Sequence, residues 1–161
     1  YGTTSFGLSE KLEISVSDSK KIIDSFYQTF KSIKPFEEKC IEFAKTNGYA
    51  KTMLNRRRYL PDINSSNFAL REFSKRAAVN AVVQGSAADL IKKAMIDVEE
   101  ALTGFKSEMI LQIHDELVFM VKEDELEEVK RIVKEKMENA FKLSVPLEVE
   151  GSVGTTWYEA K

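Results

Sequence analysis

Two short apolar runs joined by a polar tripeptide constrain the fold of this chain more than any other feature. Residues 109–113 and 117–121 are mainly apolar and compatible with strands, and His114, Asp115 and Glu116 join them. This pattern favours an antiparallel hairpin. Because both runs are apolar on nearly both faces, we expect central strands that are covered by helices.

Helical and turn patterns precede this hairpin. Ser15 has the spacing of a capping box, and apolar residues with helical periodicity follow it, which predicts a helix over about 17–32. Pro35 suits the first turn of a second helix, and Gly48 suits its end. A short exposed hairpin is expected next, with Asn55 in its turn because asparagine tolerates a left-handed backbone.

The later segments complete an α+β pattern. A helix is predicted over about 68–83, followed by a break at Gln84-Gly85-Ser86 and a second helix. Beyond the apolar hairpin, Asp124 has capping-box spacing ahead of another amphipathic helix. Residues 146–151 are predicted to form a final strand.

Composition places the chain among ordinary globular proteins. It has 161 residues, of which 43% are hydrophobic and 31% charged, so we expect one domain or a piece of a larger one. The single cysteine, Cys40, excludes a disulfide framework. The sequence lacks a glycine-rich phosphate loop, a Ser/His/Asp set and zinc-ligand spacing, which leaves hydrolase and zinc functions unsupported.

Location is predicted from what the sequence lacks. No stretch approaches the roughly 18 apolar residues of a membrane span, and no signal sequence begins the chain, so a cytoplasmic protein without membrane contact is expected. The chain begins with Tyr1 and not with methionine. We therefore expect it to be part of a longer polypeptide.

Charge is unevenly distributed. Residues 45–76 are basic, whereas acidic residues dominate from Asp97 onward. The basic segment includes Arg56, Arg57 and Arg58, which are suited to a nucleic-acid backbone. A solvated turn would have the same composition.

The hairpin tip is a candidate cation site. An aspartate held where two strands turn is rigid and exposed, which suits a hard cation such as Mg²⁺. Neighbouring strand residues point to opposite faces, so Asp115 and Glu116 would need a second carboxylate from elsewhere. Alternatively, the tripeptide is a polar turn and His114 a structural histidine.

A polar stripe forms a second candidate site. Arg76, Asn80 and Gln84 are four residues apart and share one helix face among small and apolar neighbours. Arginine pairs with phosphate, and the two amides can donate to the minor-groove acceptors of every base pair. A stripe that faces only water is the alternative.

Together these segments resemble the family A DNA polymerases of the bacterial type, in the same order and spacing from end to end. Tyr1-Gly2 with residues 5–8 resembles the end of the fingers helix and the segment after it, and residues 48–63 resemble the family's basic hairpin. Residues 76–89 resemble its conserved helix pair, and residues 112–118 its palm motif C. One departure is Asn55, where the family usually has glycine.

The resemblance implies the domain organisation. Residues 1–83 would be the carboxy-terminal part of the fingers and residues 84–161 that of the palm, both within one larger polymerase domain. It also implies template-directed addition of dNTPs to a primer 3′-hydroxyl, in DNA replication and repair. Asp115 would hold two Mg²⁺ ions with an upstream aspartate, and Glu116 would be an auxiliary carboxylate.

The resemblance further implies the contacts with primer-template DNA and dNTP. His114 would contact the primer terminus, Arg76 the template, and Asn80 and Gln84 the minor groove. Tyr1 would lie near the templating base and the nucleotide, and Arg56, Arg57 and Arg58 would grip the DNA.

The same resemblance implies that the rest of the site lies upstream. The other catalytic aspartate, the triphosphate-binding helix and the thumb would precede Tyr1, so this chain alone is expected to be inactive. A non-catalytic nucleic-acid-binding module with a polymerase-like fold is the alternative. A phage-type RNA polymerase is disfavoured because Glu116 follows His114-Asp115.

Overall fold

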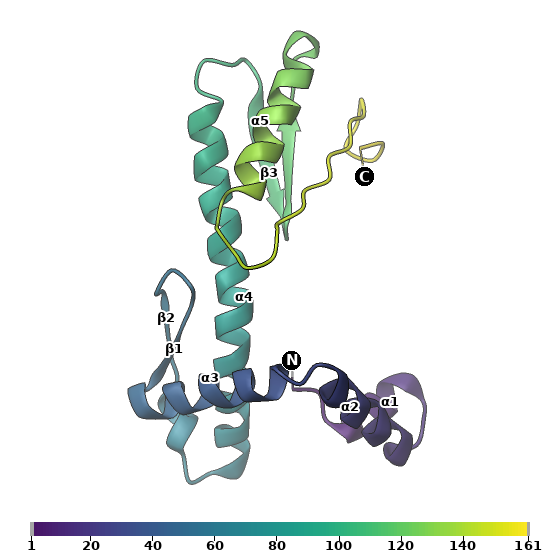
Figure 1. The fold of residues 1–161 in the computed structure, drawn as a ribbon, viewed down its shortest axis with the longest axis vertical. Coiled ribbons are helices and arrows are strands. Elements are labelled where there is room, and N and C mark those ends of the chain that lie inside the picture. The colour runs from purple at the N-terminus through teal and green to yellow at the C-terminus, as the bar shows by residue number, and fades with distance from the viewer. Residues whose placement is uncertain (1, 161) are drawn as a thin grey trace. The chain divides into compact units, whose positions relative to one another are not determined.

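The computed structural model describes residues 2–160, which divide into two compact units, one up to Ser86 and one from Ala87 onward. Within the described residues there are five α-helices and two antiparallel pairs of strands, so the predicted α+β class is confirmed (Figure 1). None of the helices described is long and apolar enough to cross a membrane. The assignment of the two parts to fingers and palm remains a prediction.

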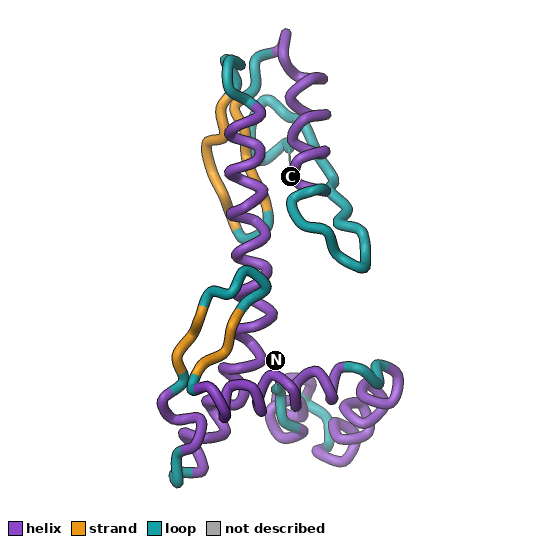
Figure 2. The backbone as a smooth tube through the Cα atoms, turned by 60° about the vertical axis from the view of Figure 1, so that its left-hand side comes forward, coloured by secondary structure: helices purple, strands orange, loops and turns teal. Residues whose placement is uncertain are grey.

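The elements follow one another along the colour gradient of Figure 1, and Figure 2 colours them by type. They are α1 (Ser5–Leu12), α2 (Val16–Thr29), α3 (Ile33–Asn47), β1 (Tyr49–Lys51), β2 (Arg57–Tyr59), the 3₁₀ turn η1 (Pro61–Asn64), α4 (Phe68–Ala101), β3 (Glu108–Ile113), β4 (Glu116–Met120), the 3₁₀ turn η2 (Glu123–Glu125) and α5 (Leu126–Glu138).

Three local predictions in the first unit are confirmed, at Ser15, Gly48 and Asn55, and the helix predicted over about 17–32 ends at Thr29. Ser15 Oγ accepts a hydrogen bond of 3.0 Å from the Asp18 amide and caps α2. Gly48 ends α3 with a φ of 76°, and Asn55 turns the β1–β2 hairpin with a φ of 63°. The short helix α1 was not predicted from the sequence.

The core of the first unit lies where α3, the β1–β2 hairpin and η1 pack on the first half of α4. Small side chains on α3, β1 and α4 let the backbones approach closely. The buried residues of this core are Ala44, Ala50, Leu60, Ile63, Ala77, Ala78 and Ala81.

The predicted break at residues 84–86 is wrong, because α4 runs through it as one helix. A glycine inside a helix costs about 1 kcal/mol relative to alanine. The helix continues because Ala87 and Ala88, which follow the glycine, are strong helix formers and the hairpin packs against α4 at this point. Ser86 Oγ donates to the Val82 carbonyl at 2.6 Å and so stays within the helix.

The second unit places the β3–β4 hairpin against helices, as predicted. Ile113 pairs with Glu116, and Met109 pairs with Phe119. Met109 and Phe119 pack on a core that the end of α4 and the start of α5 provide through Val98, Leu102 and Val129.

The expectation that helices cover both faces of this hairpin is not met by the described residues. Met120 is 57% exposed, and Ile110 and Leu111 are 53% and 44% exposed. A register shift lies between Met109 and Leu111, so Ile110 has no partner on β4. One apolar face of the hairpin is therefore open.

The expected final strand over residues 146–151 is also absent from the structure. A strand requires a neighbour whose backbone completes the hydrogen-bond ladder. Here the Val149 amide donates instead to the Glu138 carboxylate at 3.2 Å, and the segment lies beside α5 as an extended loop.

Candidate functional site

The tip of the β3–β4 hairpin holds its residues in a fixed geometry. The loop has two residues, His114 and Asp115, between the paired Ile113 and Glu116. His114 has a φ of 53°, a left-handed conformation that favours glycine. The Gln112 side-chain amide donates to the His114 carbonyl and closes the turn. Strain of this kind at an exposed tip is typical of functional positions.

The carboxylates at this tip are available to a ligand. His114, Asp115 and Glu116 are all exposed. Among residues 2–160, no side chain forms a hydrogen bond or ion pair with the carboxylate of Asp115 or Glu116. An uncompensated carboxylate on a rigid turn fits a hard cation.

Within the same residues, no group of three or more side chains could hold a metal ion. Asp115 is therefore not part of a complete cation site formed by these residues alone.

The polar stripe of the first unit lies on α4. Arg76, Asn80 and Gln84 occupy successive turns of this helix. Arg76 and Gln84 are exposed, whereas Asn80 is half-buried. The Asn80 Oδ1 atom is buried and has no hydrogen-bond partner among the described residues. A polar atom in that state usually has a partner in the functional molecule.

The start of the chain lies against this stripe. Gly2 has a φ of 77°, and a Cβ atom at Gly2 would come within 2.8 Å of Arg76 Cδ. Glycine is therefore required for the contact with the stem of Arg76. Tyr1, which was also predicted to contact template and nucleotide, lies outside the described residues.

The three hairpin arginines have different surroundings. The Arg56 guanidinium donates to the Gly85 carbonyl of α4 at 2.9 Å. Arg57 lies 4.7 Å from the centre of the Tyr49 ring, which holds it by a cation–π contact. Arg58 is exposed. The sequence pattern does not distinguish the three arginines. The contact that separates Arg56 from the others joins residues 29 positions apart, so it leaves no local signal.

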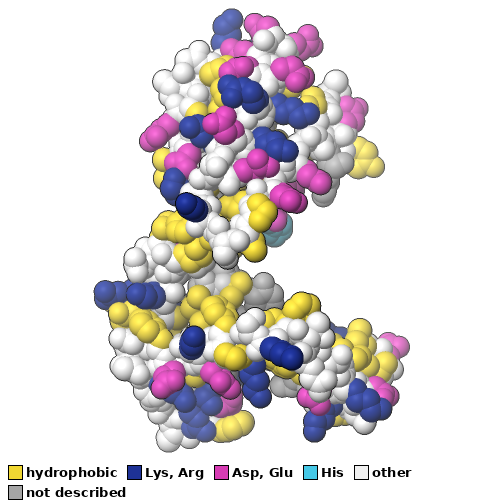
Figure 3. Space-filling model, in the orientation of Figure 1, with side chains coloured by type: hydrophobic (Ala, Val, Ile, Leu, Met, Phe, Trp, Pro, Cys, Tyr) yellow, Lys and Arg dark blue, Asp and Glu magenta, His cyan; other side chains and the backbone are white. Residues whose placement is uncertain are grey.

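The predicted site residues thus form two groups. Arg76, Asn80, Gln84 and the basic hairpin lie in the first unit, and the tip with Asp115 lies in the second. Figure 3 shows acidic and basic side chains mixed over the visible face of the second unit. Its tip carboxylates are therefore distinguished by their place on a two-residue turn and not by a large acidic field.

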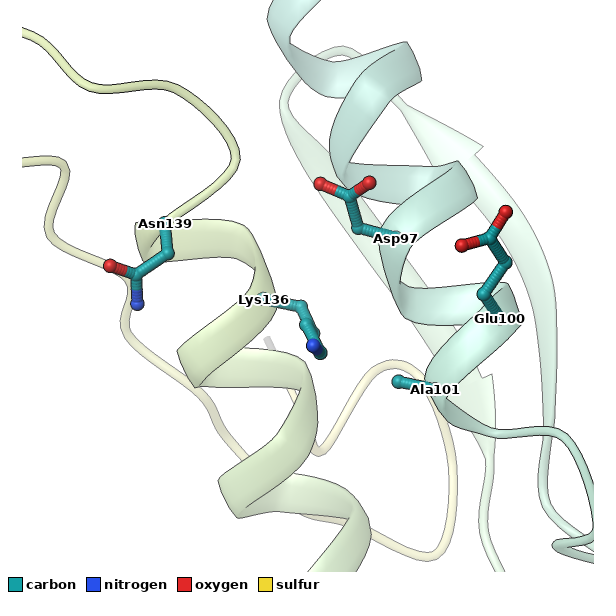
Figure 4. Close-up of a pocket in the computed structure, with 5 residues that line it drawn as sticks. All are labelled: Asp97, Glu100, Ala101, Lys136 and Asn139. Carbon is teal, nitrogen blue, oxygen red and sulfur yellow. The ribbon is translucent and has the colours of Figure 1, made fainter.

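A polar depression of about 480 Å³ between α4 and α5 contains none of the predicted residues. Asp97 and Glu100 project from α4, and the depression is also lined by Lys136 of α5 and by Asn139, which follows α5 (Figure 4). Asp97 already pairs with Lys93 on its own helix. The depression is an ordinary solvated groove between two amphipathic helices.

Comparison with known proteins gives consistent matches over the whole chain. The sequence profile of DNA polymerase family A matches residues 1–159. The chain is 47% identical over 163 aligned positions to DNA polymerase I of Streptococcus pneumoniae serotype 4, covering 100% of this chain and 19% of that protein. It is 42% identical to DNA polymerase I of Bacillus subtilis, covering 100% of this chain and 18% of that protein.

A solved structure supports the same match. The structure is the POL domain of Pol1 from M. smegmatis in complex with DNA primer-template and dNTP. It superimposes with a TM-score of 0.96 at 43% identity, covering 99% of this chain and 29% of that one. The chain therefore spans about a fifth of the length of the curated relatives that it matches.

Proposed function

The chain belongs to DNA polymerase family A, and from this premise we propose that it is the carboxy-terminal fingers and palm portion of a template-directed DNA polymerase. The intact enzyme would add dNTPs to a primer 3′-hydroxyl in the cytoplasm, and this portion alone would be inactive. The observation that carries the proposal is Asp115, a carboxylate without a partner on a rigid hairpin tip.

In this proposal Asp115 binds Mg²⁺ together with an aspartate from the preceding part of the polypeptide, and Glu116 supports the same site. The two ions would supply charge neutralisation at the primer hydroxyl and at the pyrophosphate leaving group. The protein's own contribution is position, because phosphoryl transfer depends mainly on alignment and electrostatics. His114 would bind the primer terminus beside that site.

The α4 stripe would check the shape of the nascent duplex. Arg76 would bind the template backbone, while Asn80 and Gln84 donate to minor-groove acceptors that every correct base pair presents. The exposed Arg76 and Gln84 side chains on one face of α4 support a ligand at this stripe. Arg57 and Arg58 would bind DNA phosphates, and Tyr1 would lie near the templating base and incoming nucleotide.

The test is primer extension by the intact polymerase carrying Asp115→Asn, which removes the charge and keeps the shape. We expect extension to fall about a thousandfold or more, because several kcal/mol of charge stabilisation depend on the metal ligand. DNA binding, measured alongside, should change by less than about threefold. The matched control is Asp124→Asn, an exposed aspartate in η2 of the same unit.

Extension at a near wild-type rate in Asp115→Asn would refute the metal-ligand assignment. If the intact wild-type protein bound primer-template DNA but extended no primer, it would instead be a nucleic-acid-binding module with a polymerase fold.

A further inference from the structure

The contact between the basic hairpin and α4 depends on a single glycine. A Cβ atom at Gly85 would lie 2.6 Å from Thr52 Cγ2, well inside the ordinary contact distance of about 3.5–4.0 Å. Gly85 lies within the 34-residue helix α4, where glycine costs about 1 kcal/mol relative to alanine. The chain thus has glycine at a position where its own helix would favour alanine.

Thr52 cannot easily move away from this contact. It is 8% exposed, and its Oγ1 atom accepts a hydrogen bond of 3.1 Å from the Arg56 amide. Rotating the side chain to remove Cγ2 from Gly85 would move Oγ1 and break that bond. A β-branched side chain also has few alternative rotamers. An added methyl group would therefore displace the hairpin backbone by roughly 1 Å.

Two hydrogen bonds from the hairpin tip surround the glycine. The Met53 amide donates to Ser86 Oγ at 3.0 Å, and Arg56 donates to the Gly85 carbonyl at 2.9 Å. Both would lengthen if the tip moved away from α4. We call Thr52, Met53, Arg56, Gly85 and Ser86 the hairpin interlock.

We infer that Gly85 is a positioning residue for DNA recognition, because the hairpin interlock fixes the basic hairpin to the turn of α4 that presents Gln84. Gln84 precedes Gly85 directly and is exposed, and Arg57 and Arg58 follow Arg56 on the hairpin. The interlock sets the spacing between the arginines and the amide of Gln84. The inference rests on the proposed role of Gln84 in the minor groove.

The experiment uses four variants of the intact polymerase: Gly85→Ala, Thr52→Ser, the double variant and Ser86→Ala. Thr52→Ser removes Cγ2 but keeps the hydroxyl that binds the Arg56 amide. Gly7→Ala is the control. Gly7 lies in another helix, α1, and a Cβ atom there would meet only Thr4 Oγ1, at 3.4 Å. Two quantities are measured: hydrogen exchange of residues 49–60 without DNA, and the ratio of extension from matched and mismatched primer ends.

In Gly85→Ala we expect exchange of the hairpin amides to rise about tenfold and the matched-to-mismatched ratio to fall tenfold to a hundredfold, as for a displacement of roughly 1 Å. Adding Thr52→Ser should restore both quantities to within about threefold. Ser86→Ala, which removes the acceptor for Met53 without adding volume, should loosen the hairpin in the same direction. Gly7→Ala should change neither quantity.

Unchanged hairpin exchange in Gly85→Ala would overturn the inference, as would a failure of Thr52→Ser to rescue it. Gln84→Ala separates this outcome from the proposed function. If Gln84→Ala leaves discrimination intact, the minor-groove role fails, while hairpin exchange and its rescue still decide whether Gly85 positions the hairpin.

Discussion

At the scale of single residues, backbone strain occurs at the tip that carries the proposed metal ligand. His114 has a φ of 53° in a two-residue loop. A non-glycine residue in this region costs about 1–2 kcal/mol. Glycine would remove that cost. A functional role of the imidazole would explain why histidine occupies this position despite the lower stability.

Replacing His114 by glycine and by alanine separates these two effects. Both variants lose the imidazole, so both should lose primer extension to the same extent in the intact polymerase. His114→Gly should have a free energy of unfolding about 1 kcal/mol higher than His114→Ala, because only glycine relieves the left-handed conformation. Thermal denaturation and extension assays measure the two quantities. Better extension in His114→Gly than in His114→Ala would show that the backbone conformation affects extension, and wild-type extension in both variants would show that the imidazole is not needed.

At the scale of elements, a carboxylate clamp fixes the base of the β3–β4 hairpin opposite the tip. Glu125 in η2 accepts hydrogen bonds from the Ser107 hydroxyl at 2.6 Å and from the Ser107 and Lys106 amides at 3.0 Å. Ser107 Oγ in turn accepts from the Lys122 amide at 3.0 Å. The clamp joins the residues that precede β3 to those that follow β4.

The clamp makes the stability of the protein depend on pH. The Ser107 hydroxyl and the backbone amide of Lys106 lower the pKa of Glu125 from its ordinary value of 4.5. Because this pKa is lower in the folded state than in the unfolded state, the clamp stabilises fully above about pH 4.5 and weakens as the pH falls below it.

We therefore expect Glu125→Gln to be less stable than the wild type at neutral pH, with the difference shrinking as the pH falls below about 4.5. Urea denaturation at a series of pH values measures that difference. The control is Glu148→Gln, because Glu148 is exposed and is not part of the clamp. A difference that stayed constant from neutral pH down to about pH 3 would contradict the assignment.

The elements differ in how far the sequence predicts them. Capping at Ser15, the helix end at Gly48 and the turn at Asn55 are local features, and their patterns gave correct elements. The predicted cap at Asp124 was wrong. Glu125 precedes α5 instead, no side chain caps that helix, and the Glu125 carboxylate binds residues 18 and 19 positions away. Such distant partners leave no periodic signal in the sequence.

The same reasoning explains the break predicted at Gly85. Glycine reduces helix propensity locally, which favours a break when only the sequence is considered. The structure shows instead that Gly85 admits Thr52 from the hairpin while the helix continues. The predicted strand at 146–151 failed for a related reason, because strand formation depends on a partner that the sequence pattern does not identify.

At the scale of the whole molecule, the candidate site residues are distributed over both units. Their placement on a helix stripe and at a hairpin tip follows from local spacing, so the sequence predicts it. The contact between Gly2 and Arg76, and that between Arg56 and Gly85, depend on tertiary packing. These contacts decide which side chains remain available for DNA, and no spacing rule predicts them.

The open face of the β3–β4 hairpin yields one prediction for the isolated chain and another for the intact polymerase. A charge on this face should raise the solubility of the isolated chain and lower the stability of the intact polymerase. Met120 is 57% exposed here, but the chain covers only 29% of the similar solved protein, so we expect the remaining polypeptide to bury this face. In the isolated chain, Met120→Lys and Met120→Glu should both raise solubility and reduce binding of an apolar dye.

In the intact polymerase both replacements should lower the free energy of unfolding by about 2 kcal/mol or more, because each buries a charge and removes apolar contacts. Using both signs of charge excludes a simple effect of net charge on solubility. Thermal denaturation of the intact enzyme and sedimentation of the isolated chain measure the two effects. Unchanged stability of the intact enzyme in both variants would show that the face stays open to solvent there, and that the apolar side chains of β3 and β4 serve another purpose.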